Sequence, residues 1–295
     1  MKKLITVFTP TYNRAYVLGK LYASLCNQTS DNYCWLIVDD GSTDNTKELV
    51  MKWQEEERID IQYYWQENQG KAAAHNKGVE LTETELFTCV DSDDYLTPNA
   101  VETIIETWKK ETANENNYVG ILAYKAAENS PITRFRDKVK SATLMNCYHK
   151  YGLSGDTFLI FKKEILSQYC FPKIENEKFV PEAYLYDLID QDGEFYILHE
   201  ALYIANYLAD GYTKNMRKTI KRNPNGYLLY INQRLALHYS LSNKLKDVIR
   251  YIAVKKCTNC GIRRIIREAV YPGLTVLCIL PGYLFYFLDY RKADS

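Results

Sequence analysis

The sequence predicts an α/β fold in which a mostly parallel sheet is flanked by helices and is followed by a helical carboxyl-terminal extension. Three observations predict it. In the first 125 residues, short apolar runs alternate with segments of helical periodicity. Residues 126–213 continue with looser strand and helix patterns and no clean boundary. From residue 214 the chain turns helical and strongly basic.

The first half alternates five expected strands with four expected helices. The strands are expected at residues 4–8, 34–38, 59–65, 86–90 and 119–124. Helices are expected at 17–25, from the polar cap 42–44 to about 57, at 72–81, and from 98 onward. Further strands at 158–161 and 195–207 and a helix at 182–189 would complete the same sheet. Strands that alternate with helices form parallel pairs with both faces of the sheet covered.

Composition bounds the function. The chain has 295 residues, of which 46% are hydrophobic and 25% are charged, so a packed core is expected and general disorder is excluded. The net charge is zero, which gives no overall electrostatic case for a nucleic-acid partner. Residues 1–213 carry a net charge of −12, whereas residues 214–267 carry +13. We therefore expect a domain over 1–213, with halves 1–125 and 126–213, and a basic extension over 214–295 that meets an anionic surface.

The end of the extension is apolar but interrupted. Residues 269–288 are broken by Pro-Gly pairs at 272–273 and 281–282, which argues against a simple membrane-spanning helix. A segment lying on the membrane surface, or re-entrant, is expected, with neighbouring cations facing anionic lipid: Lys255, Lys256, Arg263, Arg264 and Arg267. A helical pair packed on the body, or a dimer interface, stays open as an alternative.

The predicted location is cytoplasmic, peripheral on the inner face of the cell membrane. The apolar run after Met1 stops at Thr9-Pro10, which is too short for a signal peptide. Several of the eight cysteines lie in apolar runs, which is typical of a reducing compartment. Cys257 and Cys260 form a CxxC pair, but no second pair follows at zinc spacing, so a structural zinc is not favoured.

Polar clusters follow four of the expected strands. They occupy residues 9–14, 39–44, 67–76 and 91–94. Ligands of open parallel sheets bind outside the carboxyl ends of the strands. All four clusters are therefore expected on one rim of the sheet, where a ligand would bind.

The usual phosphate-binding and hydrolytic motifs are missing from the sequence. No G-x-G pair, GK[ST], HExxH or GxSxG occurs. A bound phosphate would then be neutralised by a divalent cation on carboxylate oxygens, which suit Mg²⁺ or Mn²⁺. Asp91 and Asp93, directly after a buried strand, fit that role. A second DxD at 190–192 precedes Gly193 and is interpreted as a turn.

These motifs together resemble the family 2 glycosyltransferases of the GT-A fold. Four segments match, in order and with family-like spacing. They are 9–14 (TPTYNR), 38–44 (VDDGSTD), the two Asn-x-Gly sequences 68–70 and 76–78, and 90–94 (VDSDD). Residues 177–182 and 207–211 look like a bacterial subgroup, which makes surface polysaccharides. The resemblance implies a GT-A domain and a metal-dependent, hexosyltransferase-like enzyme.

The resemblance also implies roles for individual residues. The first loop would lie near the base and ribose of the nucleotide through Thr9, Pro10, Tyr12 and Arg14. One carboxylate of Asp39 or Asp40, with a slight preference for Asp40, would accept the ring N–H of uracil. Further along the nucleotide sugar the implied contacts are Gly70, Lys71, Asp91 and Ser92. Asp93 would bind the metal directly, and Asp91 would contact the ribose or a metal-bound water.

An inverting transfer also requires a base that takes the proton of the acceptor hydroxyl. Glu182, after Pro181 at the start of an expected helix, is favoured by the family-like pattern. Glu177, Asp156 and Asp187 stay open as the base, and Asp210-Gly211 could contact the acceptor or close a turn.

The expected reaction moves a sugar from a nucleoside diphosphate, with UDP favoured, to a hydroxyl of a lipid-linked or other glycan. Two other classes of protein are compatible with an α/β sheet of this kind. A nucleotidyltransferase would begin with a glycine-rich basic loop, and residues 9–14 contain no glycine. A non-catalytic sugar-nucleotide-binding or assembly protein on the same scaffold stays open, although Asp91 and Asp93 are intact.

Overall fold

A computed structural model describes residues 2–112, 117–128, 130–206, 212–237 and 240–291. The chain divides into two compact units. The first comprises residues 1–170 and 185–208, and the second comprises 171–184 and 209–295.

A single mixed sheet forms the centre of the first unit, with its strands in the order β3-β2-β1-β4-β9-β6-β10-β5. The strands on this path are β1 (Ile5–Thr11), β2 (Tyr33–Asp39), β3 (Ile61–Trp65), β4 (Leu86–Cys89), β5 (Tyr95–Leu96), β6 (Gly120–Ala127), β9 (Thr157–Lys162) and β10 (Phe195–Ile204). The two-residue strands β7 (Ser130–Pro131) and β8 (Ser141–Ala142) pair with β6 and β10. The first four strands on the path are parallel, as are β6 and β10. β9 runs antiparallel between β4 and β6.

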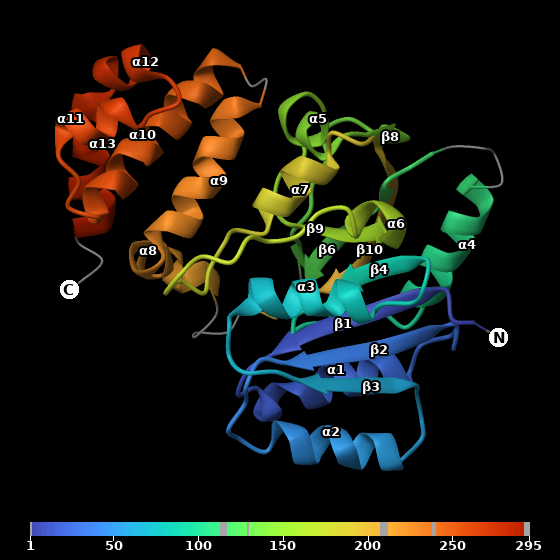
Figure 1. The fold of residues 1–295 in the computed structure, drawn as a ribbon. Helices are drawn as coiled ribbons and strands as arrows, with labels where there is room; N and C mark the ends of the chain where they lie inside the picture. The colour runs from blue at the N-terminus through green and yellow to red at the C-terminus, as the bar shows by residue number, and fades with distance from the viewer. Residues whose placement is uncertain (1, 113–116, 129, 207–211, 238–239, 292–295) are drawn as a thin grey trace. The chain divides into compact units, whose positions relative to one another are not determined.

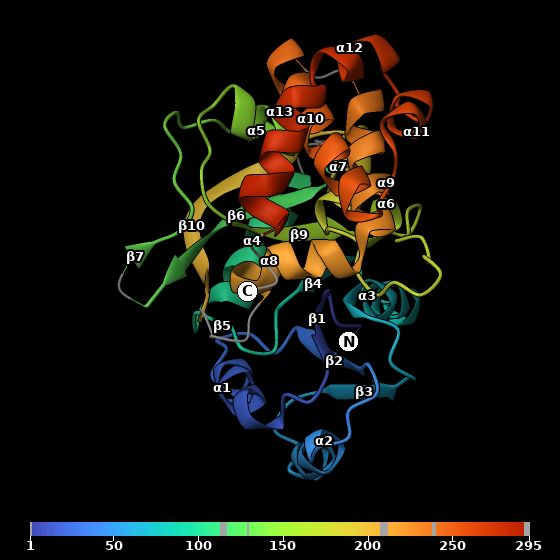
Figure 2. The same cartoon turned by 90° about the vertical axis from the view of Figure 1, so that its left-hand side faces the viewer.

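Helices cover both faces of the parallel part. They are α1 (Ala15–Cys26), α2 (Thr46–Glu55), α3 (Lys71–Leu81) and α4 (Ala100–Thr112), and the later ones are α5 (Leu144–His149), α6 (Lys163–Leu166) and α7 (Ala183–Ile189). Figures 1 and 2 show α3 on one face of β1–β3 and both α1 and α2 on the other. The sheet and helices predicted from the sequence are thereby confirmed, with shifts of a few residues at their ends.

Aromatic rings form the core between the sheet and helices α1 and α2. Tyr22 stacks on Trp53 with ring centroids 4.3 Å apart, and Trp35 of β2 is fully buried beside both. Large buried rings contribute most to a core because each removes about 150–250 Å² of surface from water. This core holds the strand ends in place.

The second unit is helical. Its helices are α8 (Tyr212–Arg222), α9 (Pro224–Ala236), α10 (Leu241–Cys257), α11 (Ile262–Arg267), α12 (Pro272–Leu277), α13 (Ile279–Phe285) and the π-helix η1 (Tyr286–Tyr290). α10 lies at its centre, with Ile252 fully buried. A Cβ at Gly282 would lie 2.6 Å from Ile252, so only glycine lets α13 approach α10 this closely. In the described part of the chain, no helix is both long and apolar enough to cross a membrane.

An exposed ion-pair cluster predicts a pH dependence of stability in this unit. Glu268 accepts from Lys255 and from Arg264, both at 2.7 Å, and these hydrogen bonds lower its pKa from 4.5 to about 2. A lowered carboxyl pKa gives stability that is present above the unfolded value and lost as pH falls towards the folded value. We expect Glu268→Gln to destabilise the protein most above pH 4.5, and the effect to shrink as pH falls towards 2.

Urea unfolding at several pH values measures this difference. Glu106→Gln, an exposed change on α4, is the matched control and should show no such pH dependence. A Glu268→Gln effect that stays constant between pH 6 and pH 2 would contradict the assignment.

Candidate functional site

The parallel register brings the strand ends together at one rim of the sheet. Thr11 of β1 pairs with Asp39 of β2, and Asp39 pairs with Trp65 of β3. On the other side of β1, Phe8 pairs with Cys89 at the end of β4. The loops after these four strands therefore start from neighbouring positions, as the sequence predicted.

The first two loops are tied to each other by hydrogen bonds. Asn13 has a positive φ of 52°, and its Oδ1 accepts from the Thr43 amide at 2.7 Å. The Asn13 amide donates to Ser42 Oγ at 2.8 Å, and the Ala15 amide donates to Asp44 Oδ2 at 3.1 Å. Asparagine tolerates the left-handed conformation better than most residues, which suits it to this position. The loops around residues 13–15 and 42–44 thus form one ordered surface, which we call the Asp39-Asp40 wall.

The paired carboxylates after β2 are buried and organise this wall. Asp39 is fully buried and accepts from the Ser42 amide at 2.7 Å and from Tyr63 Oη at 2.6 Å. Asp40 is 4% exposed and accepts from Gln66 Nε2 at 2.8 Å, the Gln69 amide at 2.9 Å and the Gly70 amide at 2.7 Å. An ionised carboxylate offers about four acceptor positions, of which Asp39 uses two and Asp40 three in these hydrogen bonds.

Asp40→Ala is expected to destabilise the protein by about 3 kcal/mol, because it leaves several donors without their acceptor and each costs about 1–3 kcal/mol. The free energy of urea unfolding measures the loss. Asp60→Ala, an exposed change at the start of β3, is the control and should be nearly neutral. Equal effects of the two substitutions would show that Asp40 does not hold the 66–70 loop.

Gly70 and Lys71 connect the third loop to the fourth. Gly70 adopts φ 95° and precedes α3, a backbone conformation that L side chains rarely adopt. Lys71 Nζ lies 2.5 Å from Asp91 Oδ1. Burial alone would raise the pKa of Asp91, but the charges of Lys71, Lys125 and Arg14 outweigh it and hold this pKa below its usual range. Asp91 is therefore ionised at neutral pH.

The carboxylates after β4 differ in environment. Burial and then the charge of Asp91 raise the pKa of Asp93, and the same two causes raise the pKa of Asp94 to about 6. Asp94 is held in place by Tyr203 Oη and by the Asn206 amide, whose nitrogen is 2.6 Å from Oδ1. Asp94 is therefore occupied by protein hydrogen bonds. Asp91 and Asp93 are close enough for the charge of Asp91 to act on Asp93, and Asp91 also contacts Lys71.

The remaining predicted donor-site residues lie on the same rim but differ in exposure. Thr9 is fully buried and its Oγ1 accepts from Trp35 Nε1 at 2.9 Å, so its side chain supports the core. Pro10 and Ser92 are buried, whereas Tyr12 is 49% exposed. Arg14 Nη1 donates to Tyr16 Oη at 2.8 Å. Of these residues, Tyr12 offers most surface to a ligand.

The candidate bases occupy different environments. Glu182 directly precedes α7 and lies in the 171–184 segment of the second unit. Glu177 accepts from the Asn225 and Gly226 amides at 2.9 Å and 2.8 Å, which caps the amino end of α9. Asp156 is exposed, and Asp187 is half-buried on α7. The residues 207–211, including Asp210-Gly211, lie outside the described part of the chain.

The second DxD has a structural role. Asp190 accepts from the Leu144 amide and, at 2.9 Å, from the Met145 amide, which caps α5. Residues 190–192 form a turn, so the turn predicted there is confirmed.

Two side chains of the later strands reach the carboxylate cluster and were not predicted. Tyr203 of β10 is fully buried, and its Oη accepts from the Asp91 amide at 3.2 Å while donating to Asp94. Lys125 of β6 lies with Nζ 4.0 Å from the centre of the Tyr203 ring. Nothing in the sequence marks them, because a Tyr or Lys within a strand has no motif and only the sheet order brings β6 and β10 here.

The carboxylates at this rim suit a divalent cation that also binds the phosphates of a ligand. Among the described residues there is no group of three or more His, Cys, Asp or Glu side chains arranged to hold a metal. Mg²⁺ and similar ions commonly use one or two carboxylates together with substrate phosphates. Asp91 and Asp93 supply that number of hard oxygen ligands, and the charge of Asp91 adds to burial in raising the pKa of Asp93.

Comparison with known proteins agrees with this geometry. Residues 6–169 match the family model described as glycosyl transferase family 2. The chain is 35% identical over 116 residues to glycosyltransferase GlyG of Streptococcus pneumoniae, a match covering 39% of this chain and 38% of GlyG. It is 28% identical over 246 residues to the GalNAc(5)-diNAcBac-PP-undecaprenol beta-1,3-glucosyltransferase of Campylobacter jejuni, covering 82% of this chain and 75% of that enzyme. The chain thus matches well under two thirds of GlyG and about three quarters of the Campylobacter enzyme.

Solved structures share the fold. TarS 1–349 of S. aureus, crystallised with UDP-GlcNAc, superposes with a TM-score of 0.58 at 18% identity, covering 100% of this chain and 90% of TarS 1–349. The mannosyltransferase PcManGT of Pyrobaculum calidifontis, in complex with GDP-Man and Mn²⁺, superposes with a TM-score of 0.56 at 16% identity, covering 99% of this chain and 83% of PcManGT. These superpositions confirm the predicted GT-A fold, and at such low sequence identity they establish the fold alone.

Proposed function

This chain belongs to glycosyl transferase family 2, and from that premise we propose that it is an inverting transferase that moves a sugar from a nucleoside diphosphate to a glycan hydroxyl. The observation that carries the proposal is the meeting of Lys71, Asp91 and Asp93 with the Asp39-Asp40 wall at one rim of the sheet. The two carboxylates can hold a metal ion that also binds a diphosphate, and the ammonium group of Lys71 can add positive charge beside that diphosphate.

The donor is proposed to lie along this rim. Tyr12 would cover the base, and Asp39 or Asp40 would accept its ring N–H. Lys71 would contribute positive charge near the diphosphate. UDP is the favoured nucleotide, because TarS 1–349, which shares the fold, was crystallised with UDP-GlcNAc.

A divalent cation, Mn²⁺ or Mg²⁺, is proposed to be held by Asp93 with help from Asp91. It would stabilise the negative charge that develops on the leaving diphosphate. PcManGT, with the same fold, was solved with Mn²⁺. The chain's own contribution is to hold the two carboxylates together, with Lys71 neutralising part of the charge of Asp91.

Glu182 is proposed to take the proton of the attacking hydroxyl while that oxygen bonds to the sugar C1 and the C1–O bond to the diphosphate breaks. The new bond then lies on the opposite face of C1, which inverts its configuration. Glu177 is less suited to this step, because its two carboxylate oxygens already accept from the amino end of α9.

The acceptor is proposed to be a lipid-linked glycan, and the second unit to rest on the membrane surface. The name of the Campylobacter relative specifies an undecaprenol-linked acceptor. Four leucines of the second unit are strongly exposed, at 77%, 81%, 59% and 57%: Leu277, Leu280, Leu284 and Leu288. The same unit carries the basic segment, which suits anionic lipid.

Calorimetric titration with UDP, dTDP and GDP, each with and without Mn²⁺, tests the donor proposal. We expect one diphosphate, UDP, to bind in a Mn²⁺-dependent manner. Absence of binding to all three would overturn the proposal. Binding without transfer or hydrolysis of any sugar nucleotide would instead indicate a non-catalytic sugar-nucleotide-binding protein.

A further inference from the structure

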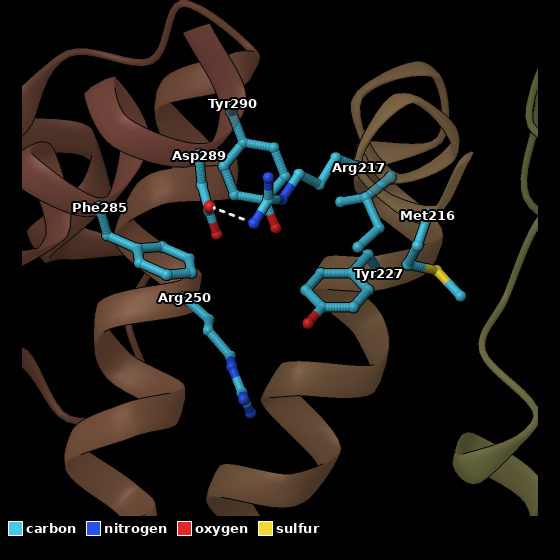
Figure 3. Close-up of a pocket in the computed structure, with 8 residues that line it drawn as sticks. Met216, Arg217, Tyr227, Arg250, Phe285, Asp289 and Tyr290 are labelled. Carbon is cyan, nitrogen blue, oxygen red and sulfur yellow. Dashed lines mark ion pairs between the residues drawn. The ribbon is translucent and has the colours of Figure 1, made fainter. Parts of the chain in front are cut away.

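The cavity in the second unit is lined by charged side chains that form ion pairs within the protein. It measures about 410 Å³ and lies between α8, α9, α10 and the α13–η1 segment (Figure 3). Arg217 pairs with Asp289 at 2.7 Å, and Arg250 pairs with Asp247 at 3.1 Å. A different cation, Lys125 of the first unit, has no such pair and is not explained by the proposed function.

Lys125 is a half-buried cation at the end of β6. Its Nζ lies 4.0 Å from the centre of the Tyr203 ring, which is a cation–π contact. An ammonium group has three N–H donors, and within the ranges that the structure describes this one makes no hydrogen bond or ion pair. Because a half-buried charge gains from a hydrogen-bond acceptor, an oxygen of a bound ligand would suit this position.

The backbone of Lys125 is fixed by Thr133, which is 2% exposed. The Lys125 amide donates to Thr133 Oγ1 at 2.7 Å, and this hydroxyl donates to the carbonyl of Asp156. Lys125 also pairs with Tyr203 in the parallel register of β6 and β10. The ammonium group is therefore presented from an ordered strand, which holds a binding group more precisely than a loop does.

The Tyr203 side chain joins Lys125 to the carboxylates that follow β4. Tyr203 Oη accepts from the Asp91 amide at 3.2 Å and donates to Asp94. The charge of Lys125 also acts on Asp91, whose pKa it helps to lower. Lys125 thus lies beside the proposed position of the metal ion and the diphosphate.

The sheet order indicates which part of the donor would reach Lys125. The proposed base contacts follow β2, and the proposed metal ligands follow β4, with β1 between these strands. In the same direction along the sheet, the next strands are β9 and β6. Because β9 is antiparallel to both β4 and β6, the carboxyl ends of β4 and β6 lie at the same rim. A donor with its base at β2 and its diphosphate at β4 would therefore extend its sugar towards β6.

We propose that Lys125 donates a hydrogen bond to an oxygen of the transferred sugar and so helps to select the donor. This inference rests on the proposed function, because the direction of the donor follows from the proposed base and diphosphate positions. An ammonium group donates hydrogen bonds and accepts none, so the sugar oxygen would be an acceptor. Methionine at position 125 would keep an unbranched side chain of similar length beside Tyr203 but could not donate to this oxygen.

Calorimetric titration of the full chain with UDP and with UDP-sugars, all in the presence of Mn²⁺, tests the proposal. The sugars are UDP-glucose, UDP-galactose, UDP-GlcNAc and UDP-glucuronic acid. Because hydrogen bonds to charged groups are stronger than neutral ones, we expect Lys125→Met to weaken binding of the preferred UDP-sugar roughly tenfold or more. UDP affinity should stay unchanged, since UDP lacks the sugar. Lys125→Arg keeps a charged donor and should bind the same UDP-sugar more tightly than Lys125→Met does.

Lys109→Met is the matched control, because Lys109 is an exposed lysine near the end of α4. It should change the affinity neither for UDP nor for the UDP-sugars. If Lys125 only supported Tyr203 and Asp91, Lys125→Met would weaken binding of UDP and of the UDP-sugars alike, and this result would overturn the proposal. Unchanged UDP-sugar affinity of Lys125→Met would overturn it as well.

The same titrations separate this inference from the proposed function. Binding of UDP to the original protein without binding of any of the four UDP-sugars would overturn the inference alone. Absence of UDP binding to the original protein would overturn the proposed function and the inference with it.

Discussion

Asp93→Ala is expected to lower kcat/KM for sugar transfer by roughly 10³-fold, because a cation ligand contributes several kcal/mol and each ~1.4 kcal/mol changes the rate tenfold. The fold should survive this change. Burial and the charge of Asp91 raise the pKa of Asp93, so its carboxylate is under repulsion and its removal relieves that repulsion. We therefore expect the thermal unfolding midpoint to stay unchanged or to rise. Transfer kinetics at several Mn²⁺ concentrations measure the first effect, and thermal unfolding measures the second.

Asp192→Ala is the matched control for this prediction. It changes the last residue of the second DxD, which is exposed and lies in a turn. We expect transfer by this variant to remain within a few-fold of the original rate. Full activity of Asp93→Ala, with the Mn²⁺ dependence retained, would remove Asp93 from the proposed metal site.

Glu182→Gln is expected to lower kcat by roughly 10²–10⁴-fold, the usual contribution of a general base, while leaving UDP affinity unchanged. The amide is nearly the same size as the carboxylate but cannot take a proton at neutral pH. Single-turnover kinetics together with UDP titration separate the loss of chemistry from any loss of binding.

Glu177→Gln, five positions earlier, is expected to lower stability and to leave kcat unchanged, which is the opposite of the result expected for Glu182→Gln. Glu177 accepts from three donors at the amino end of α9, including Asn225 Nδ2 at 2.7 Å. Its substitution should lower stability by about 1 kcal/mol, typical of a lost helix cap, with kcat retained in the folded protein. If Glu177→Gln lost turnover and Glu182→Gln kept it, the two roles would be exchanged.

The sequence by itself determined the alternation of strands and helices and the rim on which the polar clusters meet. Apolar periodicity identifies strands, and parallel pairing then sends the ends of β1, β2 and β4 to one edge. The motifs at 9–14, 38–44 and 90–94 further identified the family, because they lie in the loops that follow those strands. The same pairing predicts that Lys71 and Asp91, twenty residues apart, lie near each other, and the two are 2.5 Å apart in the structure.

Only the tertiary structure decided the rest. Periodicity carries no strand direction, so it could not show that β9 runs antiparallel between β4 and β6. That insertion determines where β6 and β10 lie, and hence why Lys125 and Tyr203 reach the carboxylates. Likewise, Glu177 and Glu182 look alike in sequence, and only the hydrogen bonds of Glu177 to α9 identify it as a helix cap.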